Sequence, residues 1–174
     1  MKLALKSGRL FGFCLLMASM LISFNALQAE EKNLSREVEM MDFDAFSHWL
    51  ERDTDSIYVI NFWATWCAPC VRELPAFEKI NEHYAEQKVK VLLVSLDNPN
   101  QMNERVIPFL EQRNIQSEVL LLDDPNSNRW IPLVSEEWSG AIPATVIYGN
   151  GFRAFYEKEF HYEELEDIIK PLLL

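Results

Sequence analysis

The sequence predicts an α/β fold in which a central mixed β-sheet is flanked by helices on both sides. Short runs of β-branched and other apolar residues alternate along the chain with segments of helical periodicity. These apolar runs are nearly continuous, which is typical of strands covered on both faces. Near the C-terminus, Gly149-Asn150-Gly151 separates two further strand-like segments and predicts an antiparallel hairpin. The 174 residues fit one domain.

The N-terminal segment differs in composition from the rest of the chain. Three basic residues precede an apolar stretch over residues 10–24, and acidic residues begin directly after Ala29. This order is that of a secretory signal peptide. We therefore predict that residues 1–29 are a signal peptide and residues 30–174 the mature domain. The alternative is an uncleaved anchor, although the stretch is short and interrupted for a span of ~20 residues.

The charge and the cysteine content restrict the function. The net charge is −11, and loss of residues 1–29 would make it −14, so nucleic acid is not expected as a partner. Cys14 lies in the predicted signal, which leaves Cys67 and Cys70 in the mature chain. A disulfide between two residues this close in sequence closes almost no loop and stabilises a fold little. The pair is therefore predicted to have a chemical role.

The first half of the domain is predicted to contain two helices and two strands. Residues 30–41 are a polar lead-in, and helical spacing begins at Asp42, with Asp42 or Asp44 suited to cap the helix. Residues 57–63 are rich in β-branched and aromatic side chains and predict a buried strand. A helix over residues 67–86 and a second buried strand over residues 89–95 follow.

The second half continues the alternation and ends with the hairpin. The predicted elements are a helix over residues 101–113, a strand over 118–122, a short helix within 129–138, strands over 144–148 and 152–156, and a helix over 163–173. Trp130 and Trp138 precede the hairpin. Such aromatic residues line a substrate groove or cover the core, and both interpretations stay open.

The spacing of Cys67 and Cys70 at the start of a helix predicts thiol chemistry. Unpaired amides and the positive end of the helix dipole point at the Cys67 sulfur, which predicts that its pKa falls from ~8.5 towards or below ~7. The thiolate is the attacking species in disulfide exchange. Cys70 lies one turn deeper and is placed to resolve a mixed disulfide on Cys67. Pro69 stiffens the turn at little cost, and Trp66 shields the sulfurs from solvent.

A metal site is the first alternative for a C-x-x-C pair. Half of a zinc site has the same spacing, but the mature chain has no second cysteine pair. His48, His83 and His161 are scattered at spacings unlike those of zinc ligands. The redox interpretation is therefore preferred, with no metal and no dissociable cofactor, because the electrons reside on the two sulfurs.

At these residues the sequence resembles a known family. Phe62-Trp63-Ala64-Thr65-Trp66-Cys67-Ala68-Pro69-Cys70 resembles the active-site stretch of thioredoxins, and more closely that of exported TlpA/ResA-type disulfide reductases. Glu73-Leu74-Pro75 and the stretch Gly140-Ala141-Ile142-Pro143-Ala144-Thr145 match the same branch. The resemblance covers roughly residues 40–174. It implies a thioredoxin-like fold with an extra segment between the second and third strands.

The resemblance also implies roles for further residues. Pro143 would follow a cis peptide bond and pack against the cysteine pair, and the backbone of Ile142 would pair with the substrate chain. Trp66 and Pro69 would contact the substrate beside them. Glu73, one turn after Cys70, would be a buried carboxylate that exchanges a proton. Typical thioredoxins carry a buried aspartate where this sequence has Asn61, so that work falls to Glu73.

The function implied is reduction of protein disulfides in the periplasm or another extracytoplasmic compartment. The partners would be disulfide-containing client proteins and a membrane thiol electron donor, with apocytochrome c maturation as one client pathway. Membrane contact is expected only if the N-terminal segment is retained. A disulfide oxidase and a copper-handling chaperone of similar fold are the alternatives. A peroxidase would need a lone peroxidatic cysteine behind a Pro and Thr pattern, which is not found.

Overall fold

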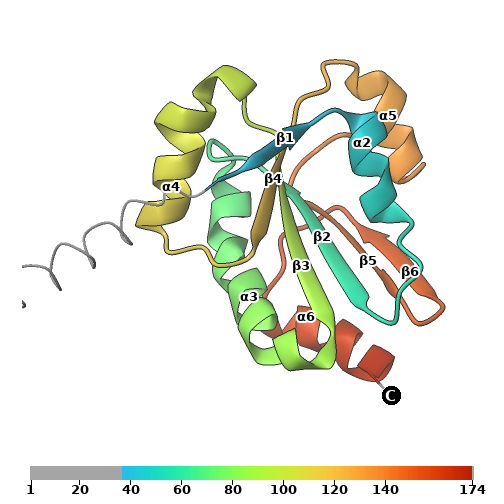
Figure 1. Cartoon of the computed structure of the whole chain (residues 1–174). Helices are drawn as coiled ribbons and strands as arrows, with labels where there is room; N and C mark the ends of the chain where they lie inside the picture. The colour runs from blue at the N-terminus through green and yellow to red at the C-terminus, as the bar shows by residue number, and fades with distance from the viewer. Residues whose placement is uncertain (1–36, 174) are drawn as a thin grey trace, which may run out of the picture. The chain divides into compact units, whose positions relative to one another are not determined.

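The continuous apolar run at residues 57–63 becomes the strand around which the sheet is built. In the computed structural model, which describes residues 37–173, all seven residues of β2 (Ile57–Trp63) are buried. The predicted signal peptide and its cleavage point lie outside the described residues. Figure 1 shows β2 inside the sheet, with helices on both sides of it. The predicted fold class is therefore confirmed.

Strands and helices alternate along the described residues. The strands are β1 (Glu39–Met41), β2 (Ile57–Trp63), β3 (Val89–Ser95), β4 (Glu118–Leu122), β5 (Ala144–Gly149) and β6 (Phe152–Tyr156). The α-helices are α2 (Phe43–Phe46), α3 (Ala68–Tyr84), α4 (Ile107–Gln112), α5 (Ser127–Val134) and α6 (Tyr162–Ile169). Short 3-10 and π-helical turns are η1 (Ser47–Leu50), η2 (Ala85–Gln87), η3 (Pro99–Gln101), η4 (Met102–Val106) and η5 (Lys170–Leu173).

The six strands form one mixed sheet in the order β1-β4-β3-β2-β5-β6. The strands β1, β4, β3 and β2 are parallel to one another, whereas β5 is antiparallel to both β2 and β6. The predicted hairpin is thus present as β5 and β6. The strands predicted at residues 57–63, 89–95 and 118–122 are confirmed with the same bounds.

The polar lead-in predicted over residues 30–41 contains a strand at its end that was not predicted. Glu39–Met41 form the edge strand β1, and Glu39 pairs with Leu120 of β4. The strand is only three residues long and two of them are exposed. Three residues are too few to show an alternation of polar and apolar side chains. The segment is a strand because it pairs with β4. Asp42 caps α2 as predicted, since its side chain accepts a hydrogen bond from the amide of Ala45.

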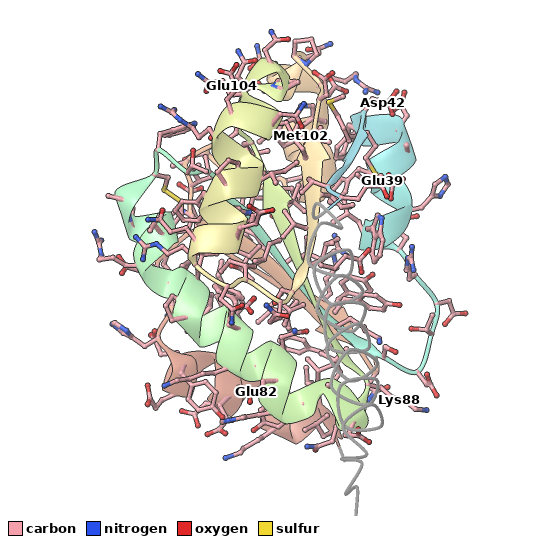
Figure 2. The ribbon with its side chains drawn as sticks, turned by 60° about the vertical axis from the view of Figure 1, so that its left-hand side comes forward. Glu39, Asp42, Glu82, Lys88, Met102 and Glu104 are labelled. Atoms are coloured by element: carbon pink, nitrogen blue, oxygen red, sulfur yellow. A yellow bond between two sulfur atoms is a disulfide. The ribbon has the colours of Figure 1, made fainter. Side chains whose placement is uncertain are left out.

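Successive residues of β2 face two separate cores. Val59 and Trp63 belong to a core shared with α3, α4 and α6. Ile60 and Phe62 belong to a core on the opposite face, shared with α2 and α5. Because side chains alternate along a strand, β2 needs apolar residues on both of its faces to serve both cores, and Asn61 is the one polar residue in it. Figure 2 shows α3 and the helical segment that begins near Met102 covering one face.

The connection between β3 and β4 differs from the single helix predicted over residues 101–113. It consists of the turn η3, the π-helical turn η4 and then α4. Pro108 lacks an amide donor, and the helix before it widens so that the amide of Ile107 donates to the carbonyl of Met102, five residues back. That this connection is the extra segment implied by the resemblance stays a prediction. Within residues 37–173, no helix has the length and apolar character needed to cross a membrane.

Candidate active site

The cysteine pair lies where β2 turns into α3. The amide of Cys67 donates to the carbonyl of Ala64 at 3.1 Å, which closes a turn directly after the strand. Cys67 is the residue that caps α3, and its sulfur accepts a hydrogen bond from the amide of Cys70 at 3.3 Å. Pro69 lies in the first turn, where its missing amide costs nothing. This is the geometry that stabilises a thiolate when the pair is reduced.

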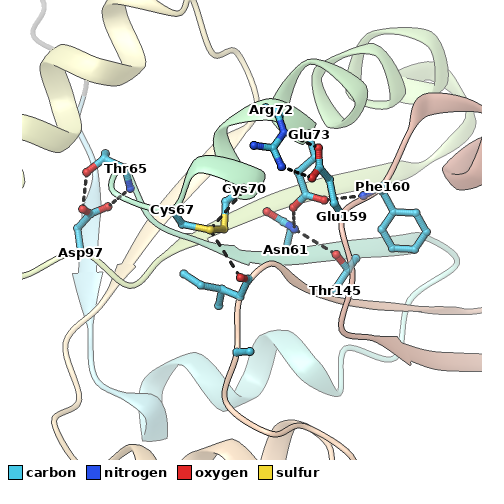
Figure 3. Close-up of a disulfide and its surroundings, with 12 residues drawn as sticks. Asn61, Thr65, Cys67, Cys70, Arg72, Glu73, Asp97, Thr145, Glu159 and Phe160 are labelled. Atoms are coloured by element: carbon cyan, nitrogen blue, oxygen red, sulfur yellow. Dashed lines mark hydrogen bonds and ion pairs between the residues drawn. A yellow bond between two sulfur atoms is a disulfide. The ribbon is translucent and has the colours of Figure 1, made fainter.

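The two sulfurs form a disulfide. The S–S distance is 1.99 Å and the Cα atoms are 5.3 Å apart, so the structure represents the oxidised state (Figure 3). The two residues differ in access: Cys67 is 6% exposed, whereas Cys70 is 0% exposed. Of the two cysteines, only Cys67 has surface exposed to solvent. Trp66, predicted to shield the pair, is 61% exposed.

The loop before β5 lies against the disulfide. The peptide bond between Ile142 and Pro143 is cis, as predicted. The carbonyl oxygen of Ile142 lies 3.6 Å from the Cys67 sulfur. Two contacts hold the loop: the indole amide of Trp138 donates to the carbonyl of Ala141 at 2.7 Å, and Ser139 donates to Glu157 through its amide and hydroxyl. The fold thus brings Ile142 to the sulfur of Cys67, although the two residues are 75 positions apart in the sequence.

The two tryptophans before this loop belong to the core. Trp130 is 4% exposed and Trp138 is 5% exposed, and both pack in the core that contains Phe62. Of the two interpretations left open by the sequence, core packing therefore applies to both side chains. Trp138 contributes to the site only through the hydrogen bond that it donates to the loop.

Glu73 is buried beside the disulfide, one turn after Cys70. It is 1% exposed, and its carboxylate accepts hydrogen bonds of 2.8 Å from the amide of Phe160 and from the side chain of Asn61. Loss of water raises the pKa of Glu73 from 4.5 to about 7, although the two hydrogen bonds favour the charged form and lower it. The expected buried carboxylate is present, and it titrates near neutral pH.

Asn61 links Glu73 to the neighbouring strand. Its amide nitrogen also donates to the hydroxyl of Thr145 at 3.1 Å. Asn61 and Thr145 stand opposite each other in the antiparallel pairing of β2 and β5, so this contact follows from the register. Among residues 37–173, the Asn61 side-chain oxygen has no hydrogen-bond partner. An amide therefore occupies the position of a second acid, and it stabilises the ionised form of Glu73 instead of competing for its proton.

A second buried carboxylate near the pair was not predicted from the sequence. Asp97, which follows β3 in a short turn, is 2% exposed. Its oxygens accept hydrogen bonds from the amide and the hydroxyl of Thr65 at 2.9 and 2.5 Å. Thr65 comes two residues before Cys67. The position of Asp97 in the sequence, just after the strand β3, could have indicated its place near the pair. Because β2 and β3 are parallel, their C-terminal ends lie at the same edge of the sheet.

Metal ligands were the first alternative for this site. Among residues 37–173, no three or more His, Cys, Asp or Glu side chains are grouped so that they could hold a metal ion. His83 instead contacts Tyr162, and His161 caps α6.

Relatives with curated names match short stretches of the chain. The chain is 35% identical over 63 residues to thioredoxin-like protein YneN of Bacillus subtilis, and this matched stretch is 36% of each protein. It is 40% identical over 48 residues to thiol-disulfide oxidoreductase ResA of Halalkalibacterium halodurans, and this matched stretch is 28% of this chain and 27% of that protein. The chain thus matches only about a third of the length of these relatives.

Solved structures and a family match extend over more of the chain. A secreted thiol-disulfide isomerase from Corynebacterium glutamicum has the same fold, with a TM-score of 0.57 and 20% identity over 71% of this chain and 79% of that one. Residues 28–151 match the AhpC/TSA family. Because this match spans more than half of the 174 residues, the chain belongs to the AhpC/TSA family of thioredoxin-like proteins.

Proposed function

We propose that this protein is a thiol–disulfide oxidoreductase that reduces disulfides of client proteins outside the cytoplasm. The observation that carries the proposal is the unequal pair at the start of α3, with Cys67 accessible at 6% exposure and Cys70 fully buried beneath it. Such a pair lets one sulfur meet a client while the other completes the exchange. The carbonyl of Ile142, 3.6 Å from the Cys67 sulfur, offers backbone for a client strand to pair with.

The reaction begins with the reduced pair. The Cys67 thiolate attacks one sulfur of the client disulfide, so that a Cys67–client bond forms and the client S–S bond breaks. Cys70 then loses its proton to ionised Glu73 and attacks the Cys67 sulfur, which forms the Cys67–Cys70 disulfide and releases the second client thiolate. The client gains two electrons, and its two thiolates take up two protons, one returned from Glu73 and one from solvent in place of the proton that Cys67 lost on ionising. The protein ends in the oxidised state that the structure shows.

The proposal extends to direction and place. Ala-Pro between the cysteines is close to the Gly-Pro of reducing thioredoxins, and strong oxidants often have a histidine in that dipeptide, which is absent here. In an oxidising compartment a reductase needs electrons from elsewhere, and a membrane thiol carrier is the donor we propose. The predicted signal peptide and the secreted relative of similar fold support an extracytoplasmic place. Apocytochrome c, whose haem-binding cysteines must be reduced, is one client class.

Two measurements on the purified protein test this function. With dithiothreitol as electron source, the protein should accelerate the reduction of insulin disulfides, and Cys67→Ala should abolish the acceleration. The reduction potential of the Cys67–Cys70 couple should lie near that of thioredoxin, about −270 mV. A potential near −120 mV, typical of a strong oxidant, would contradict the reducing direction. Stoichiometric retention of Cu(I) without insulin reduction would favour a copper chaperone instead.

A further inference from the structure

The carboxylate of Asp97 is held by neutral donors alone. It accepts the amide of Thr65 at 2.9 Å, the hydroxyl of Thr65 at 2.5 Å and the hydroxyl of Ser95 at 2.9 Å. None of the ion pairs formed by residues 37–173 includes Asp97. Figure 3 shows Asp97 and Thr65 on the side of the disulfide opposite to Glu73. A carboxylate that is buried without a cation depends on its hydrogen bonds to offset the cost of losing water. Hydrogen bonds to a charged acceptor are stronger than those between neutral groups.

These bonds end on the turn that carries Cys67. Thr65 lies inside the turn that the Cys67 amide closes on the carbonyl of Ala64 at 3.1 Å. The amide of Thr65 points out of that turn and donates to Asp97. With both its amide and its hydroxyl bound to one carboxylate, Thr65 has a fixed orientation. The direction of the chain into Trp66 and Cys67 follows from that orientation.

Asp97 itself is fixed to the sheet. It lies two residues after Ser95, the last residue of β3, which pairs with Trp63 at the end of β2. The amide of Leu96 donates to the carbonyl of Trp63 at 2.8 Å and continues this pairing by one step. The hydroxyl of Ser95 also accepts the Asp97 amide at 3.1 Å. The position of the Asp97 carboxylate is therefore fixed by the paired ends of the two central strands β2 and β3.

We propose that Asp97 is a positioning residue for Cys67, and that it acts through the amide and the hydroxyl of Thr65 to hold the turn that aims the Cys67 sulfur at an incoming disulfide. The inference rests on the proposed thiol–disulfide exchange, because it assigns a role within that reaction. It predicts that the Thr65 hydroxyl, which bonds to Asp97 and to neither sulfur, controls the rate at which Cys67 attacks. A bond that served stability alone would leave that rate unchanged.

The test uses a protein in which Cys67 is the single reactive thiol. In the Cys70→Ala background, Cys67 attacks 5,5′-dithiobis(2-nitrobenzoate), forms a mixed disulfide with one half of the reagent and releases the other half as a coloured thiolate. This rate needs no client protein. Thr65→Val removes the hydroxyl and keeps the shape of the side chain, whereas Thr65→Ser keeps the hydroxyl. Urea denaturation of each variant measures its free energy of unfolding separately.

The expected result separates the two Thr65 variants. Thr65→Val should slow the reaction about 10-fold because the sulfur is no longer aimed, and Thr65→Ser should stay within about twofold of the parent. Asp97→Asn, which removes one acceptor, should slow it as well where it folds. Equal rates for Thr65→Val and Thr65→Ser would overturn the proposal, whatever their stabilities. If Thr65→Val slows this reaction while the wild-type protein fails to reduce insulin, the positioning role stands and the proposed client reaction fails.

Discussion

At the scale of single residues, burial and hydrogen bonding act on Glu73 in opposite directions. Removal of water penalises the charged carboxylate and raises its pKa, whereas the amide of Phe160 and the side chain of Asn61 stabilise the charge and lower it. The result, about 7, gives comparable populations of both forms near neutral pH. A group with this pKa can take a proton from one thiol and return it to another.

The raised pKa of Glu73 predicts how stability depends on pH. Below pH 4.5 the carboxyl is protonated in the folded and the unfolded chain and has no effect. As pH rises from 4.5 to about 7, the unfolded chain loses this proton before the folded chain does, so the free energy of unfolding falls. The loss, complete above pH 7, amounts to at most about 3 kcal/mol. Glu73→Gln should remove this part of the pH dependence in urea denaturation of the oxidised protein.

A matched control lies on the same helix. Glu82 is an exposed acid of α3, visible at the surface in Figure 2. Glu82→Gln should keep the decline in stability between pH 4.5 and 7, because its carboxylate is not buried. If Glu73→Gln declined as steeply as the wild-type protein, burial of Glu73 would not be the cause of its proton affinity.

At the scale of elements, the hairpin sets the register that brings Thr145 opposite Asn61. Gly149 ends β5 with φ +142°, and a Cβ atom there would lie 2.6 Å from the carbonyl oxygen of Ser56, just before β2. Only a glycine allows this close approach of the two backbones. The end of β5 is thereby fixed against the start of β2, and the pairing that follows places Thr145 beside Asn61.

Gly149→Ala should therefore destabilise the fold strongly, by about 3 kcal/mol or more, because backbone must move to admit the methyl group. Gly151→Ala is the control in the same turn. It has φ +78° but no atom within 4 Å of the added Cβ, so only backbone strain of about 1 kcal/mol is expected. Urea denaturation measures both. Equal losses would show that the close approach at Gly149 does not matter to the hairpin.

The elements also show where sequence reasoning works and where it does not. The hairpin was predictable because Gly149-Asn150-Gly151 supplies the positive φ values that such a turn needs. The buried strands were predictable because their apolar runs are long. The edge strand β1 was not, since its three residues become a strand only by pairing with β4. The widened helical turn before Pro108 was not either, because a periodic pattern does not report which carbonyl each amide bonds.

At the scale of the whole molecule, the fold collects the site from distant parts of the chain. β2 ends at the cysteine turn, β3 brings Asp97 to the same edge, and the loop before β5 brings Ile142. Cys67, Cys70, Glu73 and Pro143 could be found from the sequence, because a motif carries them. Asp97 was missed because an acid in a turn is usually exposed, and its place after a strand parallel to β2 was the signal that could have found it.

The proposed exchange depends on the unequal exposure of the two cysteines, 6% for Cys67 and 0% for Cys70. Its most direct test compares Cys67→Ala and Cys70→Ala after each is reduced and mixed with a protein that contains a disulfide. Mass spectrometry then measures the mixed disulfides. Cys70→Ala should accumulate a client bound through Cys67 that dithiothreitol releases, whereas Cys67→Ala should accumulate almost none. Equal trapping by both variants, or trapping by Cys67→Ala alone, would contradict the account.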